Sequence, residues 1–401
     1  MRFPSPAGSA IIAVFTASAW CQYGVPVDGH PSWQERSVIL LTNAVRTAPV
    51  EYRDAYVGDY QILLPANYPA VDPVWWNLPL NRVARLHAQD MADNCGLSHN
   101  SCNSTEDFSA RIKRYYTETD WLAENIAMGR TTPQATIQQW IMDGETPAVD
   151  NGDEDGHRKN IMNGVYREMG AGYATGNRSW NGSLTTQTWA YWVQDFARGA
   201  PDFTSRITAG SHLFLRSGTT TFMANFFDAS GKTPSSATVT VDGAASALAR
   251  EMGSGSRGTW SVDLPRAAAC RGYFFTFTDG DGDLWRYPES GSLMTFNEGG
   301  CTQDFTTAVW HAAAPRTMRR PAAAPLRVCR HDGRIILDLA GAGRLQPDCR
   351  VEIHKADGAL VFAGAADRQR FMWPTITRGW YTVTVIPAAG SRVRLPLPVT
   401  E

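Results

Sequence analysis

The hydrophobic pattern changes along this chain, and that change constrains the fold more than any other feature. In residues 79–94, apolar positions recur at spacings of three and four, the period of an amphipathic helix. Residues 38–46 are apolar enough to form a second, buried helix, whereas residues 169–173 and 186–196 are rich in β-forming residues. Helices followed by strands predict an α+β domain over residues 33–198, in which helices and strands pack as an α/β sandwich.

Beyond residue 200 the pattern is that of short strands separated by glycine-rich turns. It predicts an immunoglobulin-like β-sandwich over residues 201–311. Residues 312–325 consist mainly of alanine, proline and arginine and are expected to form a linker. A second, small β-sandwich is predicted over residues 326–401. The strands expected in these two domains are 212–215, 220–227, 237–241, 273–277, 335–339, 351–354, 359–362 and 380–385.

The length of the chain agrees with this division into domains, and its net charge gives no indication of a nucleic-acid partner. A chain of 401 residues is expected to form two to four domains. With 43% hydrophobic and 19% charged residues it has a globular composition. The formal net charge is −2, so no excess of positive charge indicates a nucleic-acid partner.

The first 19 residues have the pattern of a cleaved secretory signal. Arg2 supplies the positive start, residues 10–15 are apolar, and Ala17-Ser18-Ala19 fits the small-residue cleavage rule. The apolar run is too short to span a bilayer, and no later stretch comes closer. We therefore expect a secreted, extracellular protein with no transmembrane segment.

Seven cysteines cannot all pair with one another. Secretion would place them in an oxidising compartment, where disulfides persist. Six of them leave 15 possible pairings, and one pair per predicted domain is the most economical choice: Cys95–Cys102, Cys270–Cys301 and Cys329–Cys349. Cys21 remains over, and whether it is free, lipidated or bonded to another chain stays open.

Four short stretches of the first domain hold the residues best suited to chemistry, namely 98–100, 123–127, 140–143 and 156–161. Together they contain two histidines and two carboxylates. Imidazole and carboxylate ligands suit zinc, but the same groups can also act as acid, base and orienting residue without a metal. The histidines are far apart in sequence, so spacing alone does not decide between these roles. The sequence contains no Gly-x-Ser-x-Gly elbow, P-loop or His-Glu-x-x-His motif.

The order of several short motifs resembles the CAP superfamily, which comprises cysteine-rich secretory proteins, antigen 5 and pathogenesis-related proteins and includes many secreted bacterial members. The resemblance covers roughly residues 33–198. The matching motifs are Asn43-x-x-Arg46, Pro79-Leu80, Ala84-x-x-His87-x-x-x-Met91, His99, Glu124-Asn125-Ile126, Trp140, His157-Arg158-x-Asn160-Ile161 and Gly170-x-Gly172.

This resemblance implies an α-β-α sandwich with a cleft where two histidines and two acids converge, and several family members bind zinc or another divalent ion there. His99 and His157 match the two histidines, and Glu124 matches one acid. The fourth position is Asp143, where the family often has glutamate, and Glu145 is the fallback. The acidic segment from Glu145 to Gly156 could line the cleft, although we favour a solvated surface loop.

The expected function is therefore that of a secreted protein whose cleft binds a divalent metal, an extracellular or cell-surface ligand such as a lipid, peptide or glycan, or both. The β domains would act as spacer or adhesion modules. The alternative is a zinc-dependent hydrolase acting on peptide or cell-wall material. Glu124 would then be the general base, the histidines would hold zinc, and Asp143 would orient a ligand.

Three further features lie outside the candidate site. His87, on the predicted helix, is expected to be a hydrogen-bonded core residue. Residues 279–283 resemble a calcium loop, but the twelfth position is Ser290 instead of the required glutamate, so a hairpin turn is favoured. The last domain resembles small C-terminal β-sandwiches of secreted bacterial proteins, some of which are sorting signals for type IX secretion.

Overall fold

The computed structural model describes residues 23–26, 29–58, 60–102, 104–116, 121–143, 150, 155–179, 186–199 and 205–308, together with seven strands between residues 327 and 399. Contacts divide the chain into two compact units, Met1–Ala312 and Ala313–Glu401. The predicted signal sequence (1–19), Cys21 and the predicted linker (312–325) lie outside the described residues.

The first part of unit 1 is built around a four-stranded sheet. Its strands are β1 (Trp75–Trp76), β2 (Leu122–Met128), β3 (Glu168–Ser179) and β4 (Thr186–Ala197). They lie in the order β1-β3-β4-β2, so β2 is at an edge. The helices are α1 (Trp33–Thr47), α2 (Pro49–Tyr52), η1 (Arg53–Val57), α3 (Leu78–Asp90), η2 (Met91–Cys95), α4 (Phe108–Lys113), α5 (Pro133–Met142) and α6 (Gly156–Met162). The α+β prediction for this region is confirmed.

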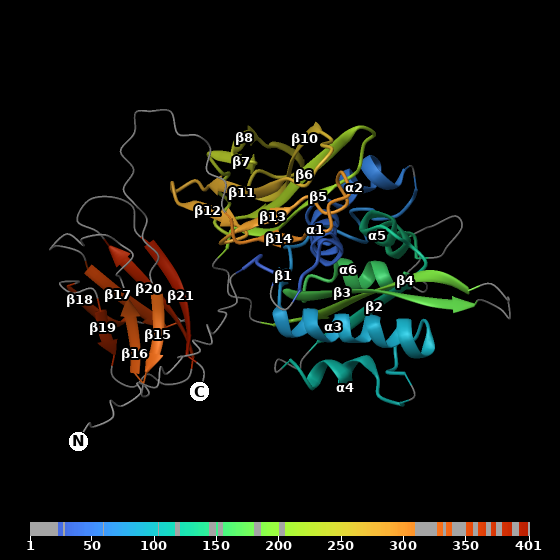
Figure 1. The fold of residues 1–401 in the computed structure, drawn as a ribbon, viewed down its shortest axis with the longest axis horizontal. Coiled ribbons are helices and arrows are strands. Elements are labelled where there is room, and N and C mark those ends of the chain that lie inside the picture. The colour runs from blue at the N-terminus through green and yellow to red at the C-terminus, as the bar shows by residue number, and fades with distance from the viewer. Residues whose placement is uncertain are drawn as a thin grey trace, which may run out of the picture. The chain divides into compact units, whose positions relative to one another are not determined.

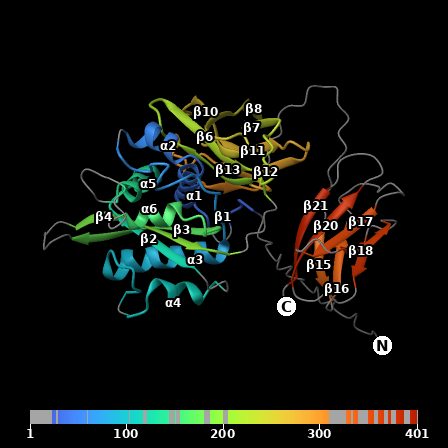
Figure 2. The same cartoon turned by 180° about the vertical axis from the view of Figure 1, so that it is seen from behind.

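Helices cover both faces of this sheet (Figure 1). On one face, Ala84 and Ala88 of α3 share a core cluster with Ile126 of β2. On the other face, Ala127 of β2 shares a different cluster with Ile137 of α5, and α1 belongs to that cluster as well. Figure 2, the view from behind, also places α3 and α4 together on one side of the sheet. Because alternate residues of a strand point to opposite faces, β2 contributes to both cores.

Close approach of α3 to β3 explains the Gly170-x-Gly172 motif. A Cβ atom on Gly172 would lie 2.2 Å from the backbone oxygen of Ala84, and one on Gly170 would lie 2.1 Å from the backbone nitrogen of Asn81. Both obstacles are backbone atoms of a helix, which cannot move aside as a flexible side chain can. The two glycines therefore fix how closely the helix packs on the sheet.

The second part of unit 1 consists of two antiparallel sheets. One has the order β5 (Ile207–Leu213), β6 (Thr219–Phe227), β10 (Arg257–Pro265) and β9 (Ala249–Gly253). The other has the order β14 (Phe305–Thr306), β13 (Ser292–Met294), β11 (Gly272–Thr278), β7 (Ser236–Val241) and β8 (Ala244–Ala247), with β12 (Leu284–Tyr287) paired to β11. Phe222 and Phe275, one from each sheet, belong to a single hydrophobic cluster. The region is β-rich as expected, and its immunoglobulin-like identity stays a prediction.

The calcium-like segment is a hairpin turn, as the sequence favours. Asp279 is buried, and one of its carboxylate oxygens accepts hydrogen bonds from the backbone N–H groups of Asp281 and Asp283 at 2.9 and 3.0 Å. The other oxygen accepts a hydrogen bond from the Trp285 indole at 2.8 Å. The segment joins the antiparallel strands β11 and β12.

Helix α1 packs against both parts of unit 1 and is almost entirely buried. The Trp33 indole donates to the carbonyl oxygen of His212 at 2.8 Å, and the hydroxyls of Ser37 and Ser211 are 2.9 Å apart. The guanidinium of Arg36 bonds Asp304 at 3.0 Å. The Trp33 ring also stacks on that of His212, so the two predicted domains of this unit share an interface of packed rings and hydrogen bonds.

Unit 2 contains two antiparallel sheets. They are β15 (Arg327–His331), β16 (Arg334–Asp338) and β19 (Arg370–Trp373) in one, and β18 (Leu360–Ala365), β17 (Arg350–Lys355), β20 (Gly379–Ile386) and β21 (Val393–Val399) in the other. Cys349 lies outside the described residues, and so does the predicted Cys329–Cys349 pair. Within the described part of the chain, we find no helix with the length and apolarity needed to cross a membrane.

The helix–sheet contact gives a first prediction. Gly172→Ala is expected to lower the free energy of unfolding by about 3 kcal/mol, because the new methyl group collides with helix backbone. Gly156→Ala is the matched control, since a Cβ atom there meets nothing within 4 Å, and it should change stability by less than about 0.5 kcal/mol. Chemical denaturation of both variants measures this, and equal effects would contradict the packing explanation.

The α1 interface gives a second prediction, on pH. His212 is fully buried between Tyr273 and the carbonyl of Phe296, and burial lowers its pKa to about 3. In the unfolded chain the imidazole of His212 takes up a proton near pH 6.5, whereas in the folded protein it does not. Unit 1 should therefore lose stability as the pH falls from 6.5 to 3, by about 5 kcal/mol from this group.

Denaturation across this pH range measures the effect. The slope of the free energy of unfolding against pH counts the protons taken up on unfolding. In His212→Gln, whose side chain takes up no proton, this slope should correspond to one proton fewer than in the wild type. An unchanged slope would show that His212 does not carry the effect.

Candidate functional site

A pocket of about 310 Å³ opens beside β2, and all four site residues predicted from the sequence line it. Its full lining is His99, Glu124, Asn125, Asp143, Gly156, His157 and Asn160. The structure thus brings together two histidines that are 58 residues apart in the sequence, one before β2 and one after it.

The pocket has two halves because β2 is an edge strand. Glu124 and Asn125 are neighbours in β2, so their side chains point to opposite faces of the sheet. Glu124 meets residues from the α3–α4 side, while Asn125 meets residues of α6. Only at the free edge of a sheet can side chains from both faces line one pocket.

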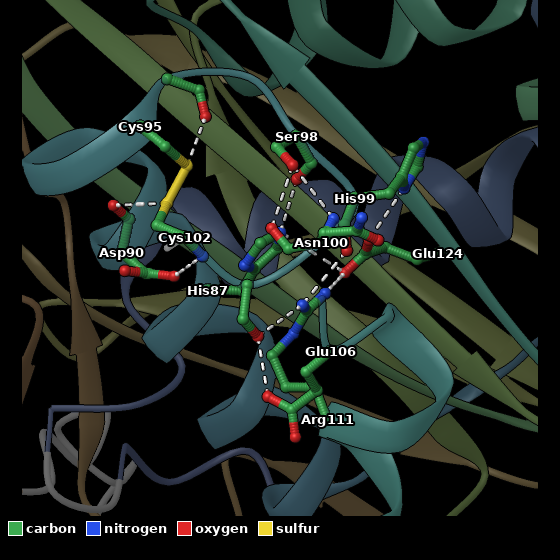
Figure 3. A network of polar contacts seen from close by, with 12 residues as sticks. His87, Asp90, Cys95, Ser98, His99, Asn100, Cys102, Glu106, Arg111 and Glu124 are labelled. Atoms are coloured by element: carbon green, nitrogen blue, oxygen red, sulfur yellow. Dashed lines mark hydrogen bonds and ion pairs between the residues drawn. A yellow bond between two sulfur atoms is a disulfide. The ribbon is translucent and has the colours of Figure 1, made fainter. Parts of the chain in front are cut away.

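In the first half, His99 is held by a buried carboxylate. The Nδ1 atom of His99 lies 2.8 Å from Oε1 of Glu124, and the guanidinium of Arg111 on α4 bonds the second oxygen, Oε2. The Glu124 side chain is fully buried, whereas that of His99 is 51% exposed. Figure 3 shows His99 and Arg111 reaching Glu124 from different segments. Both carboxylate oxygens are therefore engaged, and the ring is the part that faces solvent.

The loop that carries His99 is fixed at several points. The disulfide Cys95–Cys102 closes it, and the carbonyl of Ser98 accepts a hydrogen bond from Nε2 of His87 at 2.8 Å (Figure 3). Arg111 also donates to the carbonyl of His99 at 3.2 Å. His87 is fully buried, which confirms its interpretation as a hydrogen-bonded core residue.

In the second half, Asp143 holds His157. Asp143 ends α5 in the left-handed conformation (φ 55°), which aspartate tolerates better than most residues. One carboxylate oxygen bonds Nδ1 of His157, and the other accepts the backbone N–H of His157 at 2.9 Å. The Asp143 side chain is 4% exposed and that of His157 34%. This half repeats the arrangement of the first: a buried carboxylate behind a partly exposed imidazole.

Two motif residues, Trp140 and Asn160, donate hydrogen bonds to backbone carbonyls at the free edge of β2. The Asn160 side chain donates to the carbonyl of Glu124 at 3.3 Å and to the side chain of Asn125 at 2.8 Å. The Trp140 indole donates to the carbonyl of Ile126 at 3.0 Å. These carbonyls point away from β4 and would otherwise lack a partner in the sheet. Trp140 and Asn160 thus serve the strand that positions the pocket.

Comparison with known proteins identifies the family that the region around the pocket matches. Residues 41–196 match the family described as "Cysteine-rich secretory protein family", CAP. The chain carries a CAP domain. It is also 30% identical over 146 residues to the uncharacterized protein YkwD of Bacillus subtilis (strain 168). The match covers 36% of this chain and 44% of that relative, so the chain spans less than half of the relative's length.

The acidic segment of the CAP domain differs from the solvated loop expected for it. Asp150 is nearly buried as a side chain and accepts the backbone N–H groups of Leu63 and Leu64 at 3.0 and 2.9 Å. Asp155 is buried and bonds the hydroxyl of Tyr68. Both acids hold neighbouring backbone and side chains in place, which corrects the prediction for these two positions. Glu145, Asp153 and Glu154 lie outside the described residues.

Sequence reasoning missed two buried residues next to the pocket, Arg111 and Asp195. The guanidinium of Arg111 donates a hydrogen bond to the carboxylate of Glu124. Asp195 on β4 is fully buried, and this burial together with the neighbouring charge of Glu124 raises its pKa well above the ordinary value. Asp195 lies only one residue before Phe196 in a strand that reads as apolar. An acid in such a strand is the signal that could have revealed it.

The donor set bears directly on metal binding. Among the described residues, no three or more His, Cys, Asp or Glu side chains are arranged to hold a metal ion together. In this structure Glu124 and Asp143 bond the Nδ1 atoms of the histidines. The predicted four-ligand set is therefore arranged as two carboxylate–imidazole pairs.

The hydrogen bond from the Trp140 indole to the free edge of β2 gives a third prediction. Trp140→Phe removes the donor to the Ile126 carbonyl, which belongs to a buried residue. An unpaired buried carbonyl costs about 1–3 kcal/mol. Trp192→Phe is the matched control, because Trp192 is equally buried but donates to the carbonyl of Arg130, an exposed residue.

Water can replace the indole at Arg130 but not at Ile126. We expect Trp140→Phe to lower the free energy of unfolding by about 1–2 kcal/mol more than Trp192→Phe. Equal losses in chemical denaturation would mean that the edge hydrogen bond contributes nothing beyond packing.

Proposed function

We propose that the pocket of the CAP domain binds a divalent metal ion, zinc foremost, through the Nε2 atoms of His99 and His157. The observation that carries the proposal is the pairing of each Nδ1 with a buried carboxylate. A carboxylate that accepts from Nδ1–H fixes the tautomer, so that Nε2 keeps its lone pair. Both imidazoles are partly exposed and line one pocket, which is where those lone pairs would be used.

The residues fit an open site better than a closed one. Structural zinc sites have four protein ligands, and catalytic sites usually have three plus water. This pocket supplies two imidazoles, so the other positions would be left to water or to a bound ligand. Glu124 and Asp143 would act from behind the ligands by orienting the rings and increasing their basicity.

The compartment proposed for this activity is extracellular. The disulfides Cys95–Cys102 and Cys270–Cys301, both formed by described residues, suit an oxidising environment. A ligand entering the pocket would be a lipid, peptide or glycan from that environment. The β-rich parts would serve as spacer or adhesion modules. In unit 1, the contact of β5 with α1 would make its module part of the body that carries the pocket.

The second candidate is a hydrolase acting on peptide or cell-wall material. It is favoured by two imidazoles, each backed by a carboxylate, an arrangement suited to acid–base chemistry. Glu124 fits the role of general base poorly, because His99 and Arg111 occupy both of its oxygens. The proton-transferring group would instead be an imidazole. Turnover of a peptide or peptidoglycan library that His157→Ala abolishes would support this candidate.

Zinc titration by calorimetry tests the metal proposal and is the fourth prediction. His99→Ala and His157→Ala should each weaken zinc binding at least tenfold, because each removes one of two protein ligands. Glu124→Gln and Asp143→Asn should weaken it 10–100-fold by releasing a ring. His354→Ala is the matched control, since the side chain of His354 is 30% exposed, similar to that of His157, but belongs to unit 2.

The control should bind zinc as the wild type does. If the wild type has no measurable zinc affinity, or if His354→Ala weakens binding as much as the pocket variants, the proposal fails.

A further inference from the structure

The disulfide Cys95–Cys102 closes the segment that carries His99. Cys95 ends η2, and Cys102 lies in the loop before α4, at a sequence separation of 7. Their Cα atoms are 5.4 Å apart, so both ends of the segment are tied to one point (Figure 3). We call residues 96–102 the His99 segment. Residues 143–162, which carry His157, contain no cysteine, so the second half of the pocket has no such covalent tie.

Hydrophobic packing contributes little to holding the His99 segment. Besides the disulfide, its one apolar side chain is that of Leu97, which is 50% exposed. The backbone is held by hydrogen bonds, among them those from His87 to the carbonyl of Ser98 and from Arg111 to the carbonyl of His99. Such bonds exchange with water when a segment moves, so each contributes only modestly. The disulfide is the tie that water cannot replace.

The contact between His99 and Glu124 can open without leaving a buried charge unpaired. The His99 side chain is 51% exposed, and its neighbour Phe108 lies edge-on with the ring centroids 6.4 Å apart, so the ring can move into water. When His99 leaves Oε1 of Glu124, the guanidinium of Arg111 still bonds Oε2. A buried carboxylate that keeps a charged partner avoids most of the penalty of an unpaired charge. The position of the ring therefore depends on the segment that carries it.

The two disulfides formed by described residues differ in their exposure to solvent. Cys95 is exposed and Cys102 is half-buried, whereas Cys270 is half-buried and Cys301 is only 3% exposed. A thiolate must reach a sulfur atom in order to exchange with a disulfide, and exposed disulfides are accordingly the labile ones. We therefore expect a thiol in solution to reduce Cys95–Cys102 before Cys270–Cys301.

We propose that Cys95–Cys102 is a redox latch on the pocket: a dithiol reductant opens it, the His99 segment is released, and His99 loses its hydrogen bond to Glu124. His157 stays in place, because one oxygen of Asp143 bonds its ring and the other accepts its backbone N–H. Opening the latch thus removes one of the two imidazoles that line the pocket. The consequence for zinc rests on the proposed function, whereas the release of the segment does not.

A dithiol supplies both electrons for this reduction. One of its thiolates attacks the sulfur of Cys95, the S–S bond breaks, and Cys102 leaves as a thiolate that takes up a proton. The second thiol of the reductant loses its proton and attacks the mixed disulfide, so that Cys95 leaves as a thiolate and is protonated in turn. The products are two cysteine thiols and the disulfide of the reductant. An oxidised dithiol reverses these steps and closes the latch.

Reduction of the folded, full-length protein with dithiothreitol gives the fifth prediction. Alkylation followed by peptide mass spectrometry measures which cysteines are released as the dithiothreitol concentration rises. Cys95 and Cys102 should be alkylated at concentrations at which Cys270 and Cys301 remain bonded. Reduction of Cys270–Cys301 first, or of both disulfides at the same concentration, would overturn the proposal.

Hydrogen exchange of metal-free protein tests whether the segment is released. The backbone N–H of Ser101 donates to the carbonyl of Glu106 at 2.9 Å, and that of Cys102 donates to Asp90 at 2.7 Å. In protein reduced at Cys95–Cys102 alone, both amides should exchange at least about tenfold faster than in the oxidised protein. The amides of β4 should keep their rates, which shows that the fold is intact. Unchanged rates at Ser101 and Cys102 would contradict the release.

Nitrogen NMR of the same two forms above pH 7 separates the two halves of the pocket. On reduction, His99 should lose the signal of a hydrogen-bonded Nδ1–H, whereas His157 should keep it. An unchanged His99 signal, or an equal change at both rings, would overturn the proposal. This comparison uses the wild-type chain, so it does not depend on whether a variant folds.

The variant Cys95→Ser/Cys102→Ser imitates the open latch without thiols that would themselves bind a metal. It should bind zinc about tenfold more weakly than the wild type, because His99 is no longer positioned. Cys270→Ser/Cys301→Ser is the matched control and should bind zinc as the wild type does. Equal zinc affinity of the wild type and Cys95→Ser/Cys102→Ser would contradict the effect on the pocket. If the wild type does not bind zinc, the metal proposal fails, and the exchange and NMR results decide on the latch separately.

Discussion

The edge position of β2 is the constraint on which the rest of the pocket depends. A strand in the middle of a sheet separates its two faces, whereas an edge strand lets side chains from both faces meet beside it. Glu124 and Asn125 point to opposite faces of the sheet. The loop between η2 and α4 supplies His99 on one side, and the end of α5 together with α6 supplies the remaining lining residues on the other. An exposed strand edge also invites pairing with other chains. Here Trp140 and Asn160 occupy its outward carbonyls.

Burial of the carboxylates gives the pocket its electrostatic character. Glu124 and Asp143 are almost inaccessible to solvent, whereas the imidazoles in front of them are partly exposed. A buried charge must be paired, and Arg111 provides that pairing for Glu124. Since Arg111 also bonds the carbonyl of His99, one guanidinium neutralises the carboxylate and fixes the loop that carries the ring. The disulfide Cys95–Cys102 closes the same loop.

The part of the fold that the sequence predicts well is the part with clear periodicity. Residues 79–94 show a helical pattern and form most of α3 and η2, and residues 186–196 show a strand pattern and form β4. The sequence pattern does not predict β2 (Leu122–Met128). Glu124 and Asn125 lie on opposite faces of this strand and both are buried. The strand therefore lacks the alternation of polar and apolar residues that marks a half-exposed strand. The start of β5 at Ile207, before the predicted residues 212–215, has a similar cause: every residue of that strand is buried.

The candidate site shows the same limit. The motif order predicted His99, Glu124, Asp143 and His157, and these residues line one pocket. It could not predict how they pair, because the choice between ligand and orienting group depends on which side chains are buried. Arg111 and Asp195 were missed for a related reason. Arg111 on a short helix resembles any surface arginine, and Asp195 acquires its meaning only from the register that places it opposite Glu124.

The proposed metal site requires that buried carboxylates fix both imidazoles as Nδ1–H tautomers and leave Nε2 free towards the pocket. Nitrogen NMR of the histidine rings in metal-free protein above pH 7 tests it most directly, because protonated and unprotonated ring nitrogens resonate at different positions. We expect protonated Nδ1 and unprotonated Nε2 for His99 and His157. Protonated Nε2 atoms on these two rings would contradict the account.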